Sequence, residues 1–166
     1  MKKFIRYGLL ALAIVLCLPI LAACGEKEIT ADKAYTDSKA EYAAEGWTVE
    51  DIQSGVLTAL SEAITTQLNV TAQLNMTITA TKGFVATQDG QKIVVLYFAQ
   101  ETSAFDGKQG MTAFVDSAIT EQILGGNAFG GGSGSATVKN LWMVCSSQEA
   151  AAIFYKYAEQ VVKSSK

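Results

Sequence analysis

The sequence predicts an α+β fold, a two-layer sandwich of helices packed on a mixed sheet of three or four strands. Three observations indicate this class. Two helical patterns come first, an alternating polar and apolar stretch follows, and the last third holds two apolar segments that each lead into an amphipathic helix. Residues 31–166 have a length that suits one domain.

Two N-terminal helices are expected before the sheet. Residues 31–45 place their apolar side chains near one helical face, and Gly46 is a suitable C-terminal stop. A second helix is expected from Thr48, a good N-cap, because apolar residues recur every three or four positions between 49 and 68. A short strand at residues 47–52 is the competing interpretation.

The alternating stretch at residues 69–80 predicts a long strand with one apolar and one polar face. The same parity continues past Gly83 to residues 84 and 86, which suggests a bulge at that glycine. Asp89-Gly90 is a two-residue hairpin signal. The next strand, at residues 92–99, is apolar almost throughout and should be central, with both faces covered.

The last third contains two similar strand-then-helix units. Residues 94–104 lead into a helix at 111–124, and residues 140–150 lead into a helix at about 147–162, where Ser146 and Glu149 form a capping-box pair. If the crossover joins parallel strands, it should be right-handed. Such an order gives the fold a ferredoxin-like character.

A glycine-rich loop at residues 125–136 separates these two units. Gly125 and Gly130 have the separation of a phosphate-binding loop, but Gly131 follows where that motif has lysine. The loop also leaves a helix and enters a strand, the reverse of a phosphate cradle. Nucleotide binding is therefore not expected, and a flexible crossover or a flap tipped by Phe129 remain the two alternatives.

Composition excludes several functions. Residues 24–166 contain no histidine, arginine or proline, and their ten lysines against sixteen acidic residues give a formal charge of −6. These residues therefore lack histidine, which is the usual general base near neutral pH and the commonest metal ligand. They also lack arginine, whose guanidinium group binds phosphate and carboxylate groups through two hydrogen bonds. An acidic chain with scattered lysines is also a poor nucleic-acid binder. We expect no cofactor, no metal and no nucleic-acid partner.

The remaining candidate catalytic groups are few. Cys145 ends an apolar strand and is expected to be a small core residue, since no histidine can activate it. Glu101, Asp106 and Asp116 could form a carboxylate cluster, although their spacing favours separate solvated charges. The Thr, Asn and Gln side chains of residues 69–80 could form a recognition surface or a solvated sheet face.

The N-terminus predicts the location of the protein. A basic segment with Lys2, Lys3 and Arg6 precedes an apolar run that ends in Leu21-Ala22-Ala23-Cys24, with Gly25 following. These four residues resemble the lipobox of bacterial lipoproteins. The resemblance implies cleavage between Ala23 and Cys24 and lipid attachment to the Cys24 thiol; an uncleaved signal anchor is the alternative.

The resulting organisation has three parts: a signal peptide at 1–23, a lipidated tether at 24–30 and an α+β domain at 31–166. The layout is that of a small bacterial lipoprotein on the extracytoplasmic face of the cell membrane. We expect a non-catalytic binding or envelope-associated module, held in the membrane by lipid, whose partner is an envelope protein or a small ligand. The alternative is a small envelope hydrolase that uses Asp and Glu carboxylates.

Overall fold

The fold was analysed in a computed structural model that describes residues 29–73, 75–126 and 134–163. These residues form an α+β structure with a five-stranded antiparallel sheet. In chain order the elements are α2 (Ala31–Ala44), β1 (Thr48–Asp51), α3 (Ser54–Ala72), β2 (Ala80–Gln88), β3 (Gln91–Phe98), the 3₁₀ turn η1 (Thr102–Ala104), α4 (Met111–Leu124), β4 (Gly134–Val138), β5 (Leu141–Cys145) and α5 (Gln148–Lys163).

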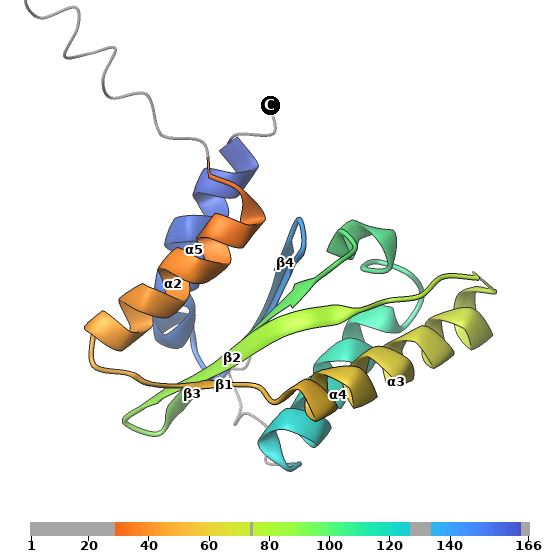
Figure 1. The fold of residues 1–166 in the computed structure, drawn as a ribbon, viewed down its shortest axis with the longest axis horizontal. Helices are drawn as coiled ribbons and strands as arrows, with labels where there is room; N and C mark the ends of the chain where they lie inside the picture. The colour runs from red at the N-terminus through yellow and green to blue at the C-terminus, as the bar shows by residue number, and fades with distance from the viewer. Residues whose placement is uncertain (1–28, 74, 127–133, 164–166) are drawn as a thin grey trace, which may run out of the picture.

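Helices cover both faces of the sheet, so the prediction of a two-layer sandwich was wrong. Figure 1 shows α2 and α5 on one side of the strands and α3 and α4 on the other. In β3, Ile93 and Val95 pack with the first helix pair, whereas Val94 and Leu96 pack with the second. An almost continuous apolar run in a central strand is what two covered faces require. The predicted central position of this strand is confirmed.

The sheet order is β1-β2-β3-β5-β4, and each neighbouring pair is antiparallel. The predicted mixed sheet of three or four strands was therefore wrong. The missed strand β4 begins inside the glycine-rich stretch and turns into β5 through Lys139-Asn140, with Lys139 at φ 54°. Since β3 and β4 each run antiparallel to β5, they point the same way and α4 connects them across the inserted strand, as in a split βαβ unit.

The prediction that the second helix begins at Thr48 was wrong. The alternative, a short strand in this region, is confirmed as β1. β1 pairs with β2 from Thr48 opposite Thr87 to Asp51 opposite Phe84. Gly46, at φ 85°, ends the preceding helical segment and lets the chain turn onto the sheet edge. α3 then starts at Ser54, which places one strand between the two N-terminal helices.

The predicted strand at residues 69–80 was also wrong. α3 continues to Ala72, and Val70, expected on the apolar face, is 74 % exposed. β2 starts only at Ala80. The helix extends this far because its apolar stripe continues through Ile64 and Leu68, which are fully buried.

Residues 76–80 run beside α3 and are bonded on that side by its polar side chains. Thr79 and Ala80 also contact β3 and the residue after it, since the Ala99 amide donates to the Thr79 carbonyl and Ala80 pairs with Phe98. The amide groups of Met76, Ile78 and Ala80 donate hydrogen bonds to polar side chains of that helix. The acceptors are Asn69 Oδ1 at 3.1 Å, Thr65 Oγ1 at 2.9 Å and Ser61 Oγ at 2.9 Å. The Thr65 hydroxyl also donates to the Ile78 carbonyl, at 3.2 Å. We call this set of contacts the side-chain ladder.

The spacing of the side-chain ladder follows from backbone geometry. Its helical members are four residues apart, which is a rise of about 6 Å. Its extended members are two residues apart, which is about 6.6 Å. Because these repeats nearly match, one polar stripe of α3 can satisfy alternate amides of the adjacent segment. The ladder thereby gives partners to three amide groups of this segment, two of which, at Met76 and Ile78, precede β2.

Gly83 has a packing role, and the irregularity in β2 lies before it. The register shifts between Ala80 and Lys82, and this shift moves the following residues to the opposite face: Ala80 packs with α3 and α4, but Phe84 packs with α2 and α5. A Cβ at Gly83 would lie 2.6 Å from Leu96 Cδ2 and 2.8 Å from Ile52 Cδ1. A side chain at this position would therefore require the Leu96 and Ile52 side chains to move.

Several local predictions are confirmed. Asp89 and Gly90, at φ 51° and 80°, form the two-residue turn between β2 and β3. The helices predicted at 31–45, 111–124 and 147–162 agree with α2, α4 and α5 within a residue. The α5 cap differs, since Ser147 Oγ, not the Ser146 side chain, accepts the Ala150 amide.

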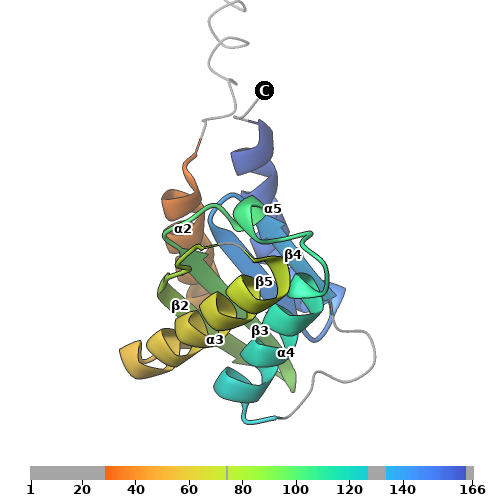
Figure 2. The ribbon, with the colours of Figure 1, turned by 90° about the vertical axis from the view of Figure 1, so that its right-hand side faces the viewer.

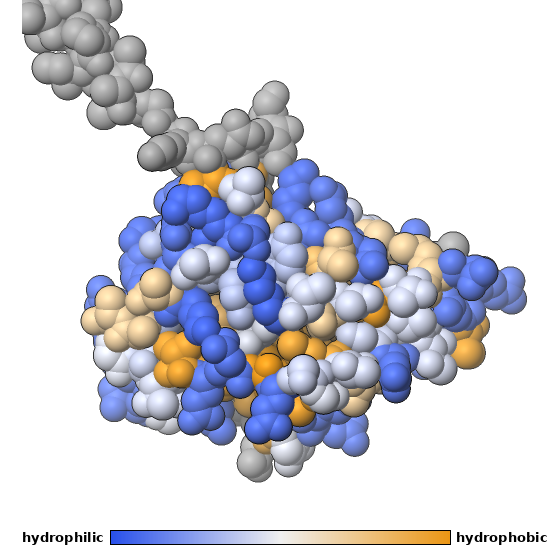
Figure 3. Space-filling view, in the orientation of Figure 1, coloured by the Kyte–Doolittle hydropathy of each residue, from blue (hydrophilic) through white to orange (hydrophobic). Residues whose placement is uncertain are grey.

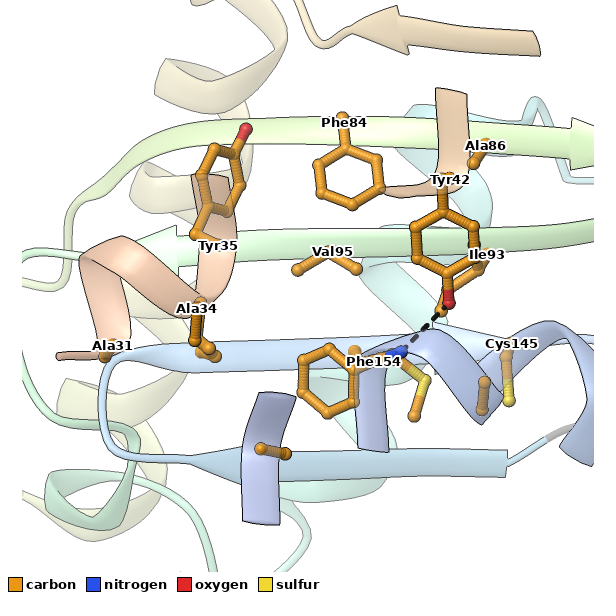
Figure 4. Packing of buried hydrophobic residues seen from close by; sticks show 14 of the residues in the cluster. Ala31, Ala34, Tyr35, Tyr42, Phe84, Ala86, Ile93, Val95, Cys145 and Phe154 are labelled. Carbon is orange, nitrogen blue, oxygen red and sulfur yellow. Dashed lines mark hydrogen bonds between the residues drawn. The ribbon is translucent and has the colours of Figure 1, made fainter. Parts of the chain in front are cut away.

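α2 and α5 form an antiparallel pair. Tyr42, late in α2, is fully buried, donates its hydroxyl to the Ala150 carbonyl at 2.6 Å and accepts the Phe154 amide at 3.3 Å (Figure 4). The same end of α2 meets α5 through Glu41, whose carboxylate binds Lys156. Figures 1 and 2 both show the start of α2 next to the end of α5.

Candidate functional site

An open pocket of about 310 Å³ lies where the end of α2, the start of α5 and the β2–β3 turn meet. Its lining combines acidic, amide, aromatic and aliphatic side chains: Glu41, Glu45, Trp47, Gln88, Asp89, Gln91, Glu149 and Ile153. We call it the acidic pocket. The molecular face shown in Figure 3 is mainly hydrophilic, with hydrophobic residues in small groups.

Hydrogen bonds fix two amide side chains of the acidic pocket. Gln91 donates from Nε2 to Glu149 Oε2 at 3.0 Å and accepts from the Ser147 hydroxyl through Oε1 at 3.0 Å. Gln88 donates from Nε2 to the Glu45 carbonyl at 3.1 Å. These bonds tie the β2–β3 hairpin to the helix pair, so the walls of the pocket are formed by the fold itself.

The charge of the acidic pocket is largely uncompensated. Glu41 is neutralised, because Lys156 Nζ lies 2.7 Å from both carboxylate oxygens and Tyr157 donates at 2.5 Å. The hydrogen bond from Lys156 and then that from Tyr157 lower the Glu41 pKa. By contrast, Glu45, Asp89 and Glu149 form no ion pair with any described residue.

Trp47 adds an aromatic wall to this acidic site. Its indole ring is half-buried and packs edge-on against Tyr42, with ring centroids 5.2 Å apart. The Tyr42 contact holds the indole in place. An aromatic ring beside carboxylates is a combination that binds organic cations by cation–π and ionic attraction.

The structure separates the three predicted candidate carboxylates into two groups. Glu101 faces Lys139 at 3.8 Å and stands apart. Asp106 and Asp116 both reach the β4–β5 hairpin: Asp106 accepts the hydroxyls of Thr112 at 2.8 Å and Thr137 at 2.6 Å. Asp116 accepts the Trp142 indole N–H at 2.8 Å.

The surroundings of Asp116 disfavour its charged form. Burial is the main cause that raises the pKa of this carboxyl, and the nearby charge of Asp106 adds to the effect. Hydrogen bonds from Ser135 and Trp142 act in the opposite direction. Both Asp106 and Asp116 have a structural role, because their hydrogen bonds join the chain around α4 to the β4–β5 hairpin.

Cys145 lies in the core between the sheet and the α2–α5 pair. It is 3 % exposed, and burial raises the pKa of its thiol. A thiol in this setting is a poor nucleophile. Across the described ranges, no group of three or more Cys, Asp or Glu side chains is arranged to hold a metal ion.

Other predicted features fall partly or wholly outside the described residues. Cys24, the cleavage position after Ala23 and Phe129 lie outside them, whereas residues 134–136 of the glycine-rich stretch belong to β4. Of the polar residues expected on a sheet face at 69–80, Thr77 and Thr79 line a groove of about 350 Å³ beside α3. Among the helices that the structure describes, none is both long and apolar enough to cross a membrane.

No family model, curated protein or solved structure matches this chain. The candidate site therefore depends on its own geometry. Sequence reasoning missed the acidic pocket because its lining comes from three separate regions, residues 41–47, 88–91 and 149–153. The one local signal was a tryptophan directly after the Gly46 helix stop.

Proposed function

We propose that this chain is a lipid-anchored protein of the extracytoplasmic membrane face, and that its folded part is a non-catalytic binding module. The lipobox residues Leu21 to Cys24 support the anchor. Two acyl chains, at about 0.8 kcal/mol per buried methylene, anchor a protein stably where one chain alone is marginal. The single observation that carries the binding role is the acidic pocket.

The ligand that suits this pocket carries a positive charge. Glu45, Asp89 and Glu149 supply negative charge that no ion pair with a described residue neutralises, and Trp47 supplies an aromatic face. A primary or substituted ammonium group meets both requirements, on a small molecule or on a lysine side chain of an envelope protein. The chain has no histidine, so this site lacks the usual base for turnover near neutral pH.

The anchor is tested by metabolic labelling with a fatty acid. Wild-type protein should take up label and begin at Cys24, whereas Cys24→Ala should accumulate as unlabelled precursor. Cys145→Ala is the matched control, because removing the buried thiol should leave labelling unchanged. A wild-type N-terminus at Met1, or label persisting in Cys24→Ala, would leave a signal-anchored protein instead.

The binding role is tested by tryptophan fluorescence during titration with a lysine-containing peptide. Trp142 is fully buried, so a saturable change reports Trp47. The change should be lost when the lysine is acetylated and weakened severalfold in Glu149→Gln, because a pocket carboxylate is then neutral. Glu62→Gln, on the other face, should bind normally. Equal binding of the acetylated peptide would contradict a cation site.

A hydrolase is the second candidate, favoured by one observation. Burial, with a smaller contribution from the nearby charge of Asp106, raises the pKa of Asp116, and a carboxyl with a raised pKa can act as a general acid. The test is turnover of envelope glycans by wild type and Asp116→Asn. Turnover abolished by this substitution would establish the hydrolase, and its absence in wild type would leave the binding module.

A further inference from the structure

The chain between the lipid and the fold is too short to let the domain turn freely. Ile29 is only 5 % exposed and packs in the core with Ala31 and Ala34 of α2, so the fold begins at this residue. From Cys24 to Ile29 there are five residue steps, which span at most about 17 Å when fully extended. The fold must therefore stay near the bilayer at the start of α2.

The acidic pocket lies at the other end of the same helix. α2 has 14 residues and is about 21 Å long. Glu41, Glu45 and Trp47, at or just after its C-terminal end, line the pocket. For the pocket to touch the bilayer with α2 upright, the tether would have to reach past the whole helix. The helix is longer than the extended tether, so this inverted orientation is disfavoured.

The charges of the two ends favour the same orientation. Near the start of α2, two lysines are paired with acids: Lys33 with Asp37, and Lys82 with Asp32. The pocket end carries carboxylates without ion-pair partners among the described residues. An anionic leaflet repels such charge within a Debye length, about 8–10 Å. The balanced end can approach the lipid surface at lower electrostatic cost.

We infer that the end formed by the start of α2 and the end of α5 faces the bilayer, and that the acidic pocket is presented away from it. This inference rests on the proposed lipid anchor. Its consequence is that the pocket receives a ligand from the envelope space, not a headgroup of the membrane in which the protein is anchored. A lipid headgroup in that leaflet would lie a helix length away from the pocket.

The orientation can be measured with two probes on one helix. Lys33→Cys and Ala44→Cys are exposed positions near opposite ends of α2, and Cys145 is too buried to react. Lipidated protein carrying a fluorine label at either position is placed in nanodiscs of phosphatidylglycerol and phosphatidylcholine that contain a gadolinium-chelating lipid. Paramagnetic relaxation should be several-fold stronger at position 33 than at position 44. Equal paramagnetic enhancement at both positions, or a stronger enhancement at 44, would overturn the inference.

A longer tether provides the control. Inserting about 12 Gly and Ser residues after Gly25 gives a flexible chain that no longer restricts the fold, so the difference between the two probes should shrink. A difference that stays unchanged would show that tether length does not set the orientation. Failure of the anchor itself is distinguishable, because unlipidated protein would not associate with the nanodiscs and both probes would be unaffected.

Discussion

Thr65→Val removes the central contact of the side-chain ladder at nearly constant side-chain volume. The Thr65 hydroxyl accepts the Ile78 amide at 2.9 Å and donates to the Ile78 carbonyl at 3.2 Å. A partly buried amide that loses its partner costs about 1–3 kcal/mol. Since both residues line an open groove that water can enter, we expect the lower part of this range, about 1–2 kcal/mol.

Urea unfolding and amide exchange measure this effect. The urea midpoint of Thr65→Val should fall with an unchanged m-value, and its Tm should fall by about 2–4 °C for each kcal/mol lost. The Ile78 amide should also lose exchange protection. Thr66→Val is the matched control, because Thr66 lines the same groove but its hydroxyl makes no hydrogen bond with the described residues. Equal stability of the two variants would refute a stabilising role for the side-chain ladder.

Three further predictions concern stability. Gly83→Ala should destabilise the fold by about 2 kcal/mol through overpacking. Gly55→Ala should instead stabilise it by about 0.5–1 kcal/mol, since no atom lies within 4 Å of the added Cβ. Urea midpoints of the two variants that move in the same direction would contradict this contrast. Tyr42→Phe should cost about 1–2 kcal/mol, because two backbone groups of α5 lose a buried partner; an unchanged free energy of unfolding would argue against it. Asp116 has a raised native pKa, so the native state holds its proton more tightly than the unfolded chain, and this stabilisation is lost as pH rises through that pKa. Asp116→Asn should therefore gain stability relative to wild type as pH rises from about 4 to 7; a constant difference across this range would count against the linkage.

Local signals in the sequence were reliable where neighbouring residues decide the structure. The Asp89-Gly90 turn and the stripes of α4 and α5 depend on contacts within a few positions, and these predictions hold. The prediction of a strand at 69–80 failed because residues 69–72 continue α3 and alternate amides of residues 76–80 bond to side chains of that helix. A Thr, Asn and Ser pattern does not reveal whether its hydroxyls face water or the amides of an adjacent segment.

The strand order of the sheet depends on β4, which local sequence propensities do not reveal. Gly134 and Ser135 read as the end of a flexible loop, yet β4 forms there because β5 offers it a complete antiparallel partner. Once β4 occupies the edge, β5 must lie between it and β3, which excludes the parallel pairing expected from two strand-then-helix units. Because the five-residue edge strand β4 was missed, the predicted topology of the whole sheet was wrong.

The position of the acidic pocket relative to the proposed lipid anchor has the same long-range origin. Tyr42 contacts Ala150 and Phe154 across more than 100 residues of sequence, and this contact joins the end of α2 to the start of the antiparallel helix α5. Antiparallel packing brings the start of α2 next to the end of α5. It also brings Glu45, just after the end of α2, close to Glu149 at the start of α5. Because α2 begins directly after the proposed lipidated tether, the packing around Tyr42 also contributes to the orientation that we infer for the fold at the membrane.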